Sequence, residues 1–259
     1  MIKRFPAIVL LTLCAFSQSL AAPFSYTWRI EDLAKTNAAT VELRDRNNRL
    51  LRRVDTRQMI YLYSVMQAIE EVSELRSELL ITDGEQPNAF ATKGMAELVP
   101  AEHGDGDKTG AKTEDAVMQG RALADAKPID KDNAVEINII GINFAMLDLL
   151  GLDVHMAAAL IGHELGHLKL NHGEDHKNRR RTDIRTAGNT RYSRDNEREA
   201  DYLGAIWAVE AGYDPQGAVR LQELLYKKTK HLSGGFSGTH PSSIERLTKL
   251  KSLARRLSE

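Results

Sequence analysis

The sequence predicts an α+β fold that is mainly helical, in one domain that follows a short N-terminal leader. Two observations predict this fold. Apolar residues recur at helical spacing in a long stretch from residue 56 and again in several stretches after residue 153. Short apolar runs typical of strands occur between residues 88 and 143. We find no internal repeat and no second domain, so residues 22–259 are expected to form one unit.

The composition is that of an ordinary globular protein. Apolar residues make up 42% of the 259 residues and charged residues 27%, which is enough apolar material for a sizeable core. The net charge of −1 provides no overall field that would attract nucleic acid or an anionic surface. A partner that binds by charge must therefore recognise a local patch, and we expect no nucleic-acid partner.

The first 21 residues have the pattern of a secretory signal peptide. Lys3 and Arg4 precede an apolar run over residues 7–16, and the small-residue site Ser19-Leu20-Ala21 follows. We therefore expect cleavage near Ala21 and export to the periplasm. The alternative is an uncleaved anchor, but the apolar run is too short to span a bilayer stably.

The single cysteine lies in this leader. Leu13 stands before Cys14, where a lipoprotein signal needs a small residue, so we expect no lipid attachment and at most peripheral membrane contact. Without Cys14 the mature chain has no thiol, which excludes cysteine-based catalysis and a cysteine-ligated zinc site. A metal site in this chain must use histidine and carboxylate.

The first half of the mature chain predicts one long helix and two strand regions. Residues 56–81 carry apolar side chains at helical spacing, and Asp83-Gly84 ends this helix. Residues 87–99 are predicted to form short strands. A β-branched apolar run begins at residue 134, and a helical or turn segment follows it to Gly151. The apolar positions of the predicted helix are Met59, Leu62, Val65, Met66, Ile69, Val72 and Leu79.

Residues 100–133 are rich in Gly, Asp, Lys and Ala and poor in apolar residues, which predicts a flexible insertion. His103 lies in it with Asp105 and Asp107. Because no helix or strand is predicted to hold these side chains together, we favour a solvated loop over a metal site.

The second half predicts four helices. The first runs from Asp153, as N-cap, to about Asn171 and stops at Gly173. A basic loop over residues 174–194 follows, which is expected to be solvated; it could alternatively meet anionic lipids or acidic proteins, or act as a lid or a site of self-cleavage. The remaining predicted helices are 194–210, capped by Ser193 or Asp195 and ending at Gly212; 215–230, capped by Asp214; and 241–257.

The predicted helix after Asp153 contains the motif His-Glu-x-x-His. His163 and His167 are four residues apart and therefore lie about 40° apart on one helix face, so both imidazoles can reach one ion. Glu164, beside the first histidine, can serve as a general base. The alternative is a buried histidine pair satisfied by backbone carbonyls. His172 lies about 180° from His163 on a continuous helix, which predicts a helix-end histidine and not a ligand.

A third ligand is predicted from the next helix, where Glu197 and Asp201 are four residues apart on one face. One of them could bind the metal while the other accepts the second ring N–H of a ligating histidine. The alternative is that Glu197 forms part of a charged exterior turn with Arg194 or Arg198.

These motifs resemble those of the zinc metallopeptidase family that includes the heat-shock membrane protease HtpX and the CAAX prenyl proteases, in particular its soluble periplasmic members. The resemblance rests on His163-Glu164-x-x-His167 with Glu197-x-x-Ala200-Asp201. The segments "NAFAT" at 88–92 and "THPSSIERL" at 239–247 are also similar to the family's edge strand and His-Pro segment. The resemblance covers roughly residues 56–257 and implies a gluzincin-like fold, with a small edge β-sheet packed on the active-site helices.

Carried over to this chain, the resemblance implies that His163, His167 and Glu197 bind one zinc ion and that Glu164 is the catalytic base. It implies that Asp201 supports a ligating histidine. His240 would lie near the metal, where it could block or tune the open coordination position. Judged locally, His240 is equally well interpreted as a histidine that precedes a helix starting at Pro241.

The chain departs from the family's pattern in two respects. Lys93 and Met95 stand near the turn where the family usually has a Gly-rich turn and a short strand, and the polar insertion follows them. In this family, substrate strands often pair with the edge strand in this region, so the departure bears on how a substrate docks. We also expect the chain to lack the transmembrane helices of the heat-shock members and a helical-repeat domain.

The function implied is a zinc endopeptidase that hydrolyses misfolded or misassembled envelope proteins with a zinc-activated water and Glu164 as base. Its expected partners are protein or peptide substrates and envelope or outer-membrane assembly proteins. The main alternative is a latent or non-proteolytic chaperone or assembly factor that uses the zinc fold for binding. A metal-dependent hydrolase of non-peptide substrates is a further alternative, for which the helical layout offers no support.

Overall fold

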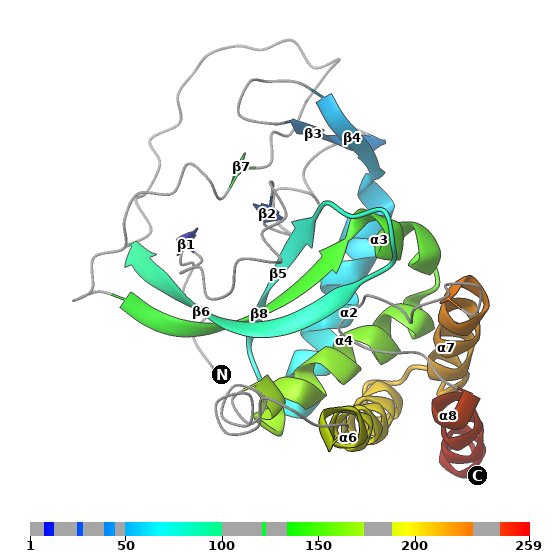
Figure 1. The fold of residues 1–259 in the computed structure, drawn as a ribbon. Helices are drawn as coiled ribbons and strands as arrows, with labels where there is room; N and C mark the ends of the chain where they lie inside the picture. Colours follow the sequence, from blue (N-terminus) through cyan, green and yellow to red (C-terminus); the bar gives the residue numbers. More distant parts are fainter. Residues whose placement is uncertain are drawn as a thin grey trace, which may run out of the picture.

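A computed structural model gives the architecture of the chain (Figure 1). It describes residues 8–12, 25–27, 39–44, 50–99, 121–122, 134–173, 188–229 and 244–259. The predicted α+β fold, mainly helical, is confirmed: a small sheet packs on a group of helices, and the helices carry most of the core.

The sheet is centred on three strands: β5 (Ser77–Thr82), β8 (Ala134–Asn143) and β6 (Ala89–Val99). β5 runs parallel to β8, and β6 runs antiparallel to it. Three short strands extend the sheet to the order β1-β6-β8-β5-β2-β7, namely β1 (Ile8–Thr12), β2 (Ser25–Thr27) and β7 (Arg121–Ala122). The sequence had predicted the strands β6 and β8, and both are present.

β1 lies inside the predicted signal peptide and pairs with the end of β6 at residues 95–99. Removal of residues 1–21 would therefore take this strand from the sheet. A separate hairpin of β3 (Thr40–Arg44) and β4 (Leu50–Asp55), with Val41 and Val54 buried, was not predicted.

Helix α2 (Thr56–Ser73) is shorter than the helix predicted over 56–81. It ends where Glu74 takes a left-handed backbone conformation, with φ 58°, and residues 77–82 form β5 instead. The prediction that Leu79 lies in the helix was wrong because this apolar run is buried on both faces of a strand. Leu79 and Ile81 lie on one face, Leu80 lies on the other, and all three are buried. A short run that is apolar on both faces suits a central strand as well as a helix.

Helix α3 (Phe144–Leu150) follows β8, and three residues separate it from helix α4 (Val154–Lys169). Asp153 is the N-cap of α4, as predicted: its Oδ1 accepts hydrogen bonds from the backbone amides of His155 and Met156, both at 3.0 Å. Arg220, from a later helix, also pairs with Asp153, with Nε 2.9 Å from Oδ2. Asp153 therefore fixes both the start of α4 and its contact with that helix.

Asp153→Ala is expected to lower the free energy of unfolding by about 1–2 kcal/mol, because the first turn of α4 loses its cap. Asp153→Asn should lose less, since the amide oxygen still caps the helix. Burial alone would raise the pKa of Asp153, but the Arg220 guanidinium and the capping amides hold that pKa below its ordinary value. The stabilisation is therefore present above about pH 4 and is lost as the pH falls through the folded-state pKa. Urea titrations at neutral and acidic pH would measure this, and equal losses for both variants would contradict the capping role.

Three further helices complete the core: α6 (Gly188–Glu210), α7 (Gln216–Thr229) and α8 (Ile244–Leu257). α7 starts as predicted, with Asp214 Oδ1 accepting from the Gln216 amide at 2.9 Å. α6 starts at Gly188, not at residue 194, so Ser193 and Asp195 lie within the helix and do not cap it. The last seven residues of the predicted basic loop 174–194 are accordingly helical.

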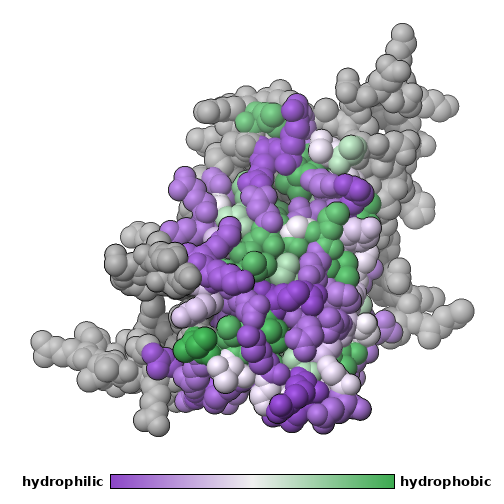
Figure 2. All heavy atoms as spheres, turned by 90° about the vertical axis from the view of Figure 1, so that its right-hand side faces the viewer, coloured by the Kyte–Doolittle hydropathy of each residue, from purple (hydrophilic) through white to green (hydrophobic). Residues whose placement is uncertain are grey.

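The helices lie in layers on one side of the sheet (Figure 1). α2 and α4 are next to the sheet, α6 and α7 pack on α4, and α8 packs on α6 and α7. On the side of the molecule where α7 and α8 lie, hydrophobic side chains gather toward the middle of the face, with hydrophilic ones around them (Figure 2). No helix among the described residues is long and apolar enough to cross a membrane.

Candidate metal centre

The centre of the fold is the contact between α4 and α6, and two glycines make it close. A Cβ placed on Gly204 would lie 2.5 Å from the His163 backbone nitrogen, and one placed on Gly162 would lie 2.7 Å from the Gly204 carbonyl oxygen. Only glycine at both positions lets the two backbones approach this far. The ligand candidates on α4 and α6 are therefore held face to face.

The structure brings His163, His167 and Glu197 together, and they form the one group of this kind among the described residues. The Nε2 atoms of the two histidines are 3.1 Å apart. Glu197 Oε2 lies 3.5 Å from His163 Nε2, and Glu197 Oε1 lies 3.4 Å from His167 Nε2. Ligands at about 2.0–2.1 Å from a tetrahedral zinc ion are about 3.3–3.4 Å from one another. The donor set therefore fits zinc in both chemistry and spacing.

The charges around these donors also fit a divalent cation. Glu164, Glu197 and Asp201 supply three carboxylates at or near the core; Glu164 is 0% exposed and Glu197 3%. Arg246, 9% exposed, supplies one positive charge among them. With neutral histidines the ionised cluster sums to −2. Buried charge is stable only when it is balanced by opposite charge. The cluster therefore suits an ion of charge +2.

Asp201 lies behind His163. Its Oδ1 is 3.0 Å from His163 Nδ1, the ring nitrogen that faces away from the other candidate ligands. Burial by itself would lower the pKa of His163, but the carboxylates of Asp201 and Glu197 outweigh it and raise the pKa to about 10. Burial would likewise raise the pKa of Asp201, yet Arg246 and His163 hold it below its ordinary value. The site therefore favours positive charge at the position of the three donors.

Arg246 was not singled out by the sequence reasoning, although it lies in the "THPSSIERL" segment. Its Nη1 is 2.6 Å from Glu197 Oε2, and its Nη2 and Nε are 2.6 and 2.8 Å from the two oxygens of Asp201. It therefore holds a candidate ligand and the partner of another ligand at once. The available signal was its place on α8, on the same face as the buried residues Leu250 and Leu253.

His172 has a different role from the one predicted. It is 6% exposed, and its Nδ1 lies 2.9 Å from Nδ1 of His167. Its Nε2 lies 3.1 Å from Glu199 Oε2. With a metal on His167 Nε2, the proton of His167 is on Nδ1 and is donated to His172, which then donates its own Nε2 proton to Glu199. His172 is thus outside the ligand set, as predicted, but it supports His167 as Asp201 supports His163.

His172→Phe is expected to lower zinc affinity about 10–100-fold, because His167 loses the acceptor that fixes its ring. Glu199→Gln is the control: the amide oxygen still accepts from His172, so the affinity should change much less. Competition with a chromophoric chelator measures both. Wild-type affinity in His172→Phe would contradict the supporting role.

Gly204→Ala tests whether the close approach of α4 and α6 positions the ligands. The new methyl group must push against backbone atoms, so we expect a loss of about 1–3 kcal/mol in the free energy of unfolding and weaker zinc binding, since Glu197 lies on the displaced helix. Gly173→Ala is the control, because a Cβ there meets nothing within 4 Å. Thermal denaturation and zinc titration give the two quantities. Unchanged values for Gly204→Ala would show that the helices can separate without cost.

Several predicted features lie outside the described residues. These are His240, with its two interpretations, His103 with its neighbouring aspartates, and residues 174–187 of the basic loop. Most of the insertion 100–133 also lies outside them, apart from β7. What the sequence predicts for these residues therefore remains a prediction.

Comparison with known families agrees with this geometry. Residues 181–254 match the model of Peptidase family M48. The matched segment contains Glu197, Asp201 and Arg246, which the fold places against His163 and His167 of α4. No curated protein matches the chain. The matched segment and the half of the site built on α4 meet in one candidate metal centre, and the match over residues 181–254 supports assignment of this chain to the zinc metallopeptidases of family M48.

Proposed function

We propose that this protein is a zinc-dependent endopeptidase of family M48 that binds one zinc ion per chain through His163, His167 and Glu197. The observation that supports this most is the position of Glu164. Its buried carboxylate follows the first ligand directly and lines a cavity next to the donor set. A base beside a metal site and an open cavity is the arrangement that peptide hydrolysis needs.

Zinc in this ligand set would polarise the scissile carbonyl and bring the pKa of a water molecule toward neutrality. Glu164 takes the proton of the attacking water and passes it to the leaving amine. Asp201 holds the His163 ring, and the pair of His172 and Glu199 holds the His167 ring. Arg246 keeps the Glu197 and Asp201 carboxylates in place. No covalent intermediate is required.

The substrates and location follow from the leader and from the resemblance. The pattern of residues 1–21 supports export to the periplasm after cleavage near Ala21. Substrates there would be misfolded or misassembled envelope proteins, with outer-membrane assembly proteins among the partners. Membrane contact would be peripheral at most.

The test is cleavage of unfolded casein by the chain purified after export, with its N-terminus sequenced and its zinc content measured. We expect a start at Ala22, one zinc per chain, and cleavage that a chelator stops and added zinc restores. Bound zinc without cleavage would contradict the peptidase proposal and favour a binding or assembly role. Cleavage that resists the chelator would contradict the role of the metal.

A further inference from the structure

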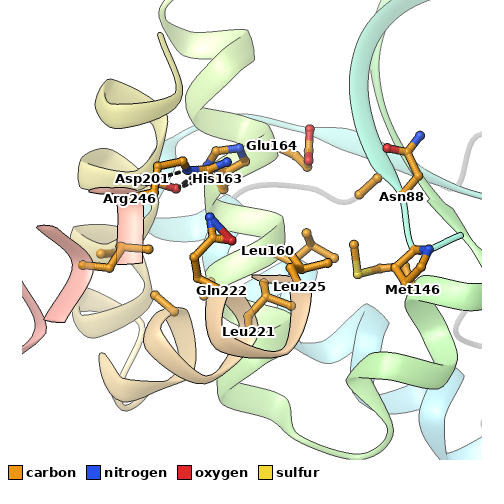
Figure 3. A pocket seen from close by; sticks show the side chains of 16 residues that line it. Asn88, Met146, Leu160, His163, Glu164, Asp201, Leu221, Gln222, Leu225 and Arg246 are labelled. Carbon is orange, nitrogen blue, oxygen red and sulfur yellow. Dashed lines mark hydrogen bonds and ion pairs between the residues drawn. The ribbon is translucent and has the colours of Figure 1, made fainter. Parts of the chain in front are cut away.

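The start of β6 forms the wall that faces Glu164 in the cavity beside the metal centre. Asn88, which directly precedes β6, and Ala89, its first residue, line this cavity together with Glu164 of α4. In Figure 3 the Glu164 carboxylate points toward the side where Asn88 lies. A peptide that reaches Glu164 through this cavity therefore passes beside Asn88 and Ala89. How firmly the start of β6 is held decides how well this path is defined.

Asn143, at the end of β8, holds the start of β6 by hydrogen bonds. Its Oδ1 accepts from the Asn88 backbone amide at 3.0 Å, and its Nδ2 donates to the Gln86 carbonyl oxygen at 2.7 Å. Its own backbone nitrogen donates to the Asn88 carbonyl oxygen at 3.0 Å. Asn143 is 6% exposed, so little water competes for these bonds. Both backbone polar groups of Asn88 are therefore bonded to Asn143.

The same side chain also begins helix α3, which forms another part of the cavity wall. Asn143 is the N-cap of α3, and its Oδ1 accepts from the Met146 amide at 2.9 Å. Met146 lines the cavity, and Figure 3 shows it on the same side of Glu164 as Asn88. One amide group therefore fixes β6 and α3 relative to each other.

The loop before β6 closes tightly over this amide. A Cβ placed on Gly84 would lie 2.2 Å from Asn143 Nδ2, which is too close for two non-bonded atoms. Glycine at position 84 therefore lets the loop approach the Asn143 side chain this far. An amide that is hydrogen-bonded on both its oxygen and its nitrogen, and is covered by the loop, has little freedom to move.

We propose that Asn143 is a positioning residue for substrate binding, which fixes the backbone at Asn88 opposite Glu164 and so keeps the path of the peptide to the metal centre in place. Asn143 acts through Asn88, since among the described residues it is not one of those that line the cavity. A displacement of about 1 Å in a group that positions a substrate can cost about 100-fold in rate. The inference rests on the proposed peptidase function and adds to it the residue that holds the substrate side of the site.

Asn143→Ser separates the two roles of this side chain. Serine is also a good N-cap, so α3 keeps its first turn, but the shorter side chain has no amide to donate to the Gln86 carbonyl and loses its hold on Asn88. With a fluorogenic peptide copied from a casein cleavage site, we expect KM of the exported, zinc-loaded enzyme to rise at least about tenfold. We expect kcat to stay within about threefold of the wild type, because the lost contact contributes to binding and not to the chemical step.

Two further measurements separate this effect from a loss of stability. A merely structural role would lower kcat and zinc content together, because part of the enzyme would be unfolded, and would leave KM unchanged. Hydrogen exchange of the Asn88 amide, followed in the same variant, should become faster while exchange in α4 stays as in the wild type.

Asn138→Ser is the matched control on the same strand. Asn138 Nδ2 donates to the Arg76 carbonyl oxygen at 2.8 Å, and the loss of this bond should leave KM unchanged. Gly84→Ala pushes on the Asn143 amide from the loop and should raise KM as well. In the double variant of Asn143→Ser and Gly84→Ala, the shorter side chain makes room for the new methyl group. KM should therefore rise no further than in Asn143→Ser alone.

An Asn143→Ser enzyme that is folded, zinc-loaded and unchanged in KM would overturn this inference and leave the peptidase proposal standing. An equal rise of KM in Asn138→Ser would overturn it too, since any lost hydrogen bond of β8 would then have the same effect. If Asn143→Ser does not fold, an unchanged KM in Gly84→Ala overturns the inference. Absence of chelator-sensitive cleavage in the wild type would overturn both proposals.

Discussion

Replacing Glu164 by Gln should lower kcat by at least about 100- to 10,000-fold while the fold and the zinc content stay as in the wild type. The two side chains have nearly the same shape, and residue 164 is fully buried, so packing is conserved. A neutral amide cannot take a proton from water or return one to the leaving amine. The measurement is the initial rate of casein cleavage together with zinc content and circular dichroism.

Two further variants decide whether such a loss is specific to Glu164. His163→Ala should lose both zinc and activity, because a ligand is removed. Glu71→Gln, an exposed position on α2, should change neither. If Glu164→Gln retained activity within about tenfold of the wild type, Glu164 would not be the general base. If it lost its zinc, the loss of activity would reflect a disturbed site.

The sequence could predict the parts of the site that depend on one helix. Asp153 caps α4 through its own next two amides, and the spacing of His163 and His167 is a property of any helix. Both are local, so they can be read without knowledge of the fold. The helical spacing also placed Glu197 and Asp201 on one face as candidates for the third ligand, and the resemblance to a known family then selected Glu197.

The parts that failed depend on where the backbone turns. His172 was placed on the far side from His163 by assuming a continuous helix to about Asn171. α4 ends at Lys169, and Asn171 takes a left-handed conformation with φ 56°. This turn brings the His172 ring back to His167. Asparagine adopts this conformation more readily than most residues, but the helix was predicted to stop at Gly173, so the turn at Asn171 was missed.

Arg246 shows a second limit of sequence reasoning. Its partners Glu197 and Asp201 are 49 and 45 residues earlier in the chain, and only the packing of α8 on α6 brings them together. A charged residue in an amphipathic helix is normally solvated. Arg246 is buried only because of the tertiary packing, and its contribution to the free energy of unfolding can be measured.

Arg246→Met should lower the free energy of unfolding by about 3–5 kcal/mol, the usual cost of removing one partner from a buried ion pair. Glu197 and Asp201 would then repel each other in the core, so the loss should be largest in metal-free protein. Zinc should restore part of it, because the ion replaces the lost positive charge. Urea titrations with and without zinc measure both effects.

The matched control is Arg198→Met on α6, whose partly exposed side chain pairs with Glu245 and should contribute less than about 1 kcal/mol. A double variant that also changes a carboxylate provides a stricter test. Arg246→Met combined with Asp201→Asn removes one negative charge along with the positive one, so the double variant should lose less stability than the sum of the two single variants. Additive losses would contradict a shared cluster. Coupling between the two would show that α8, at the end of the chain, helps to set the charge of a metal centre built on α4 and α6.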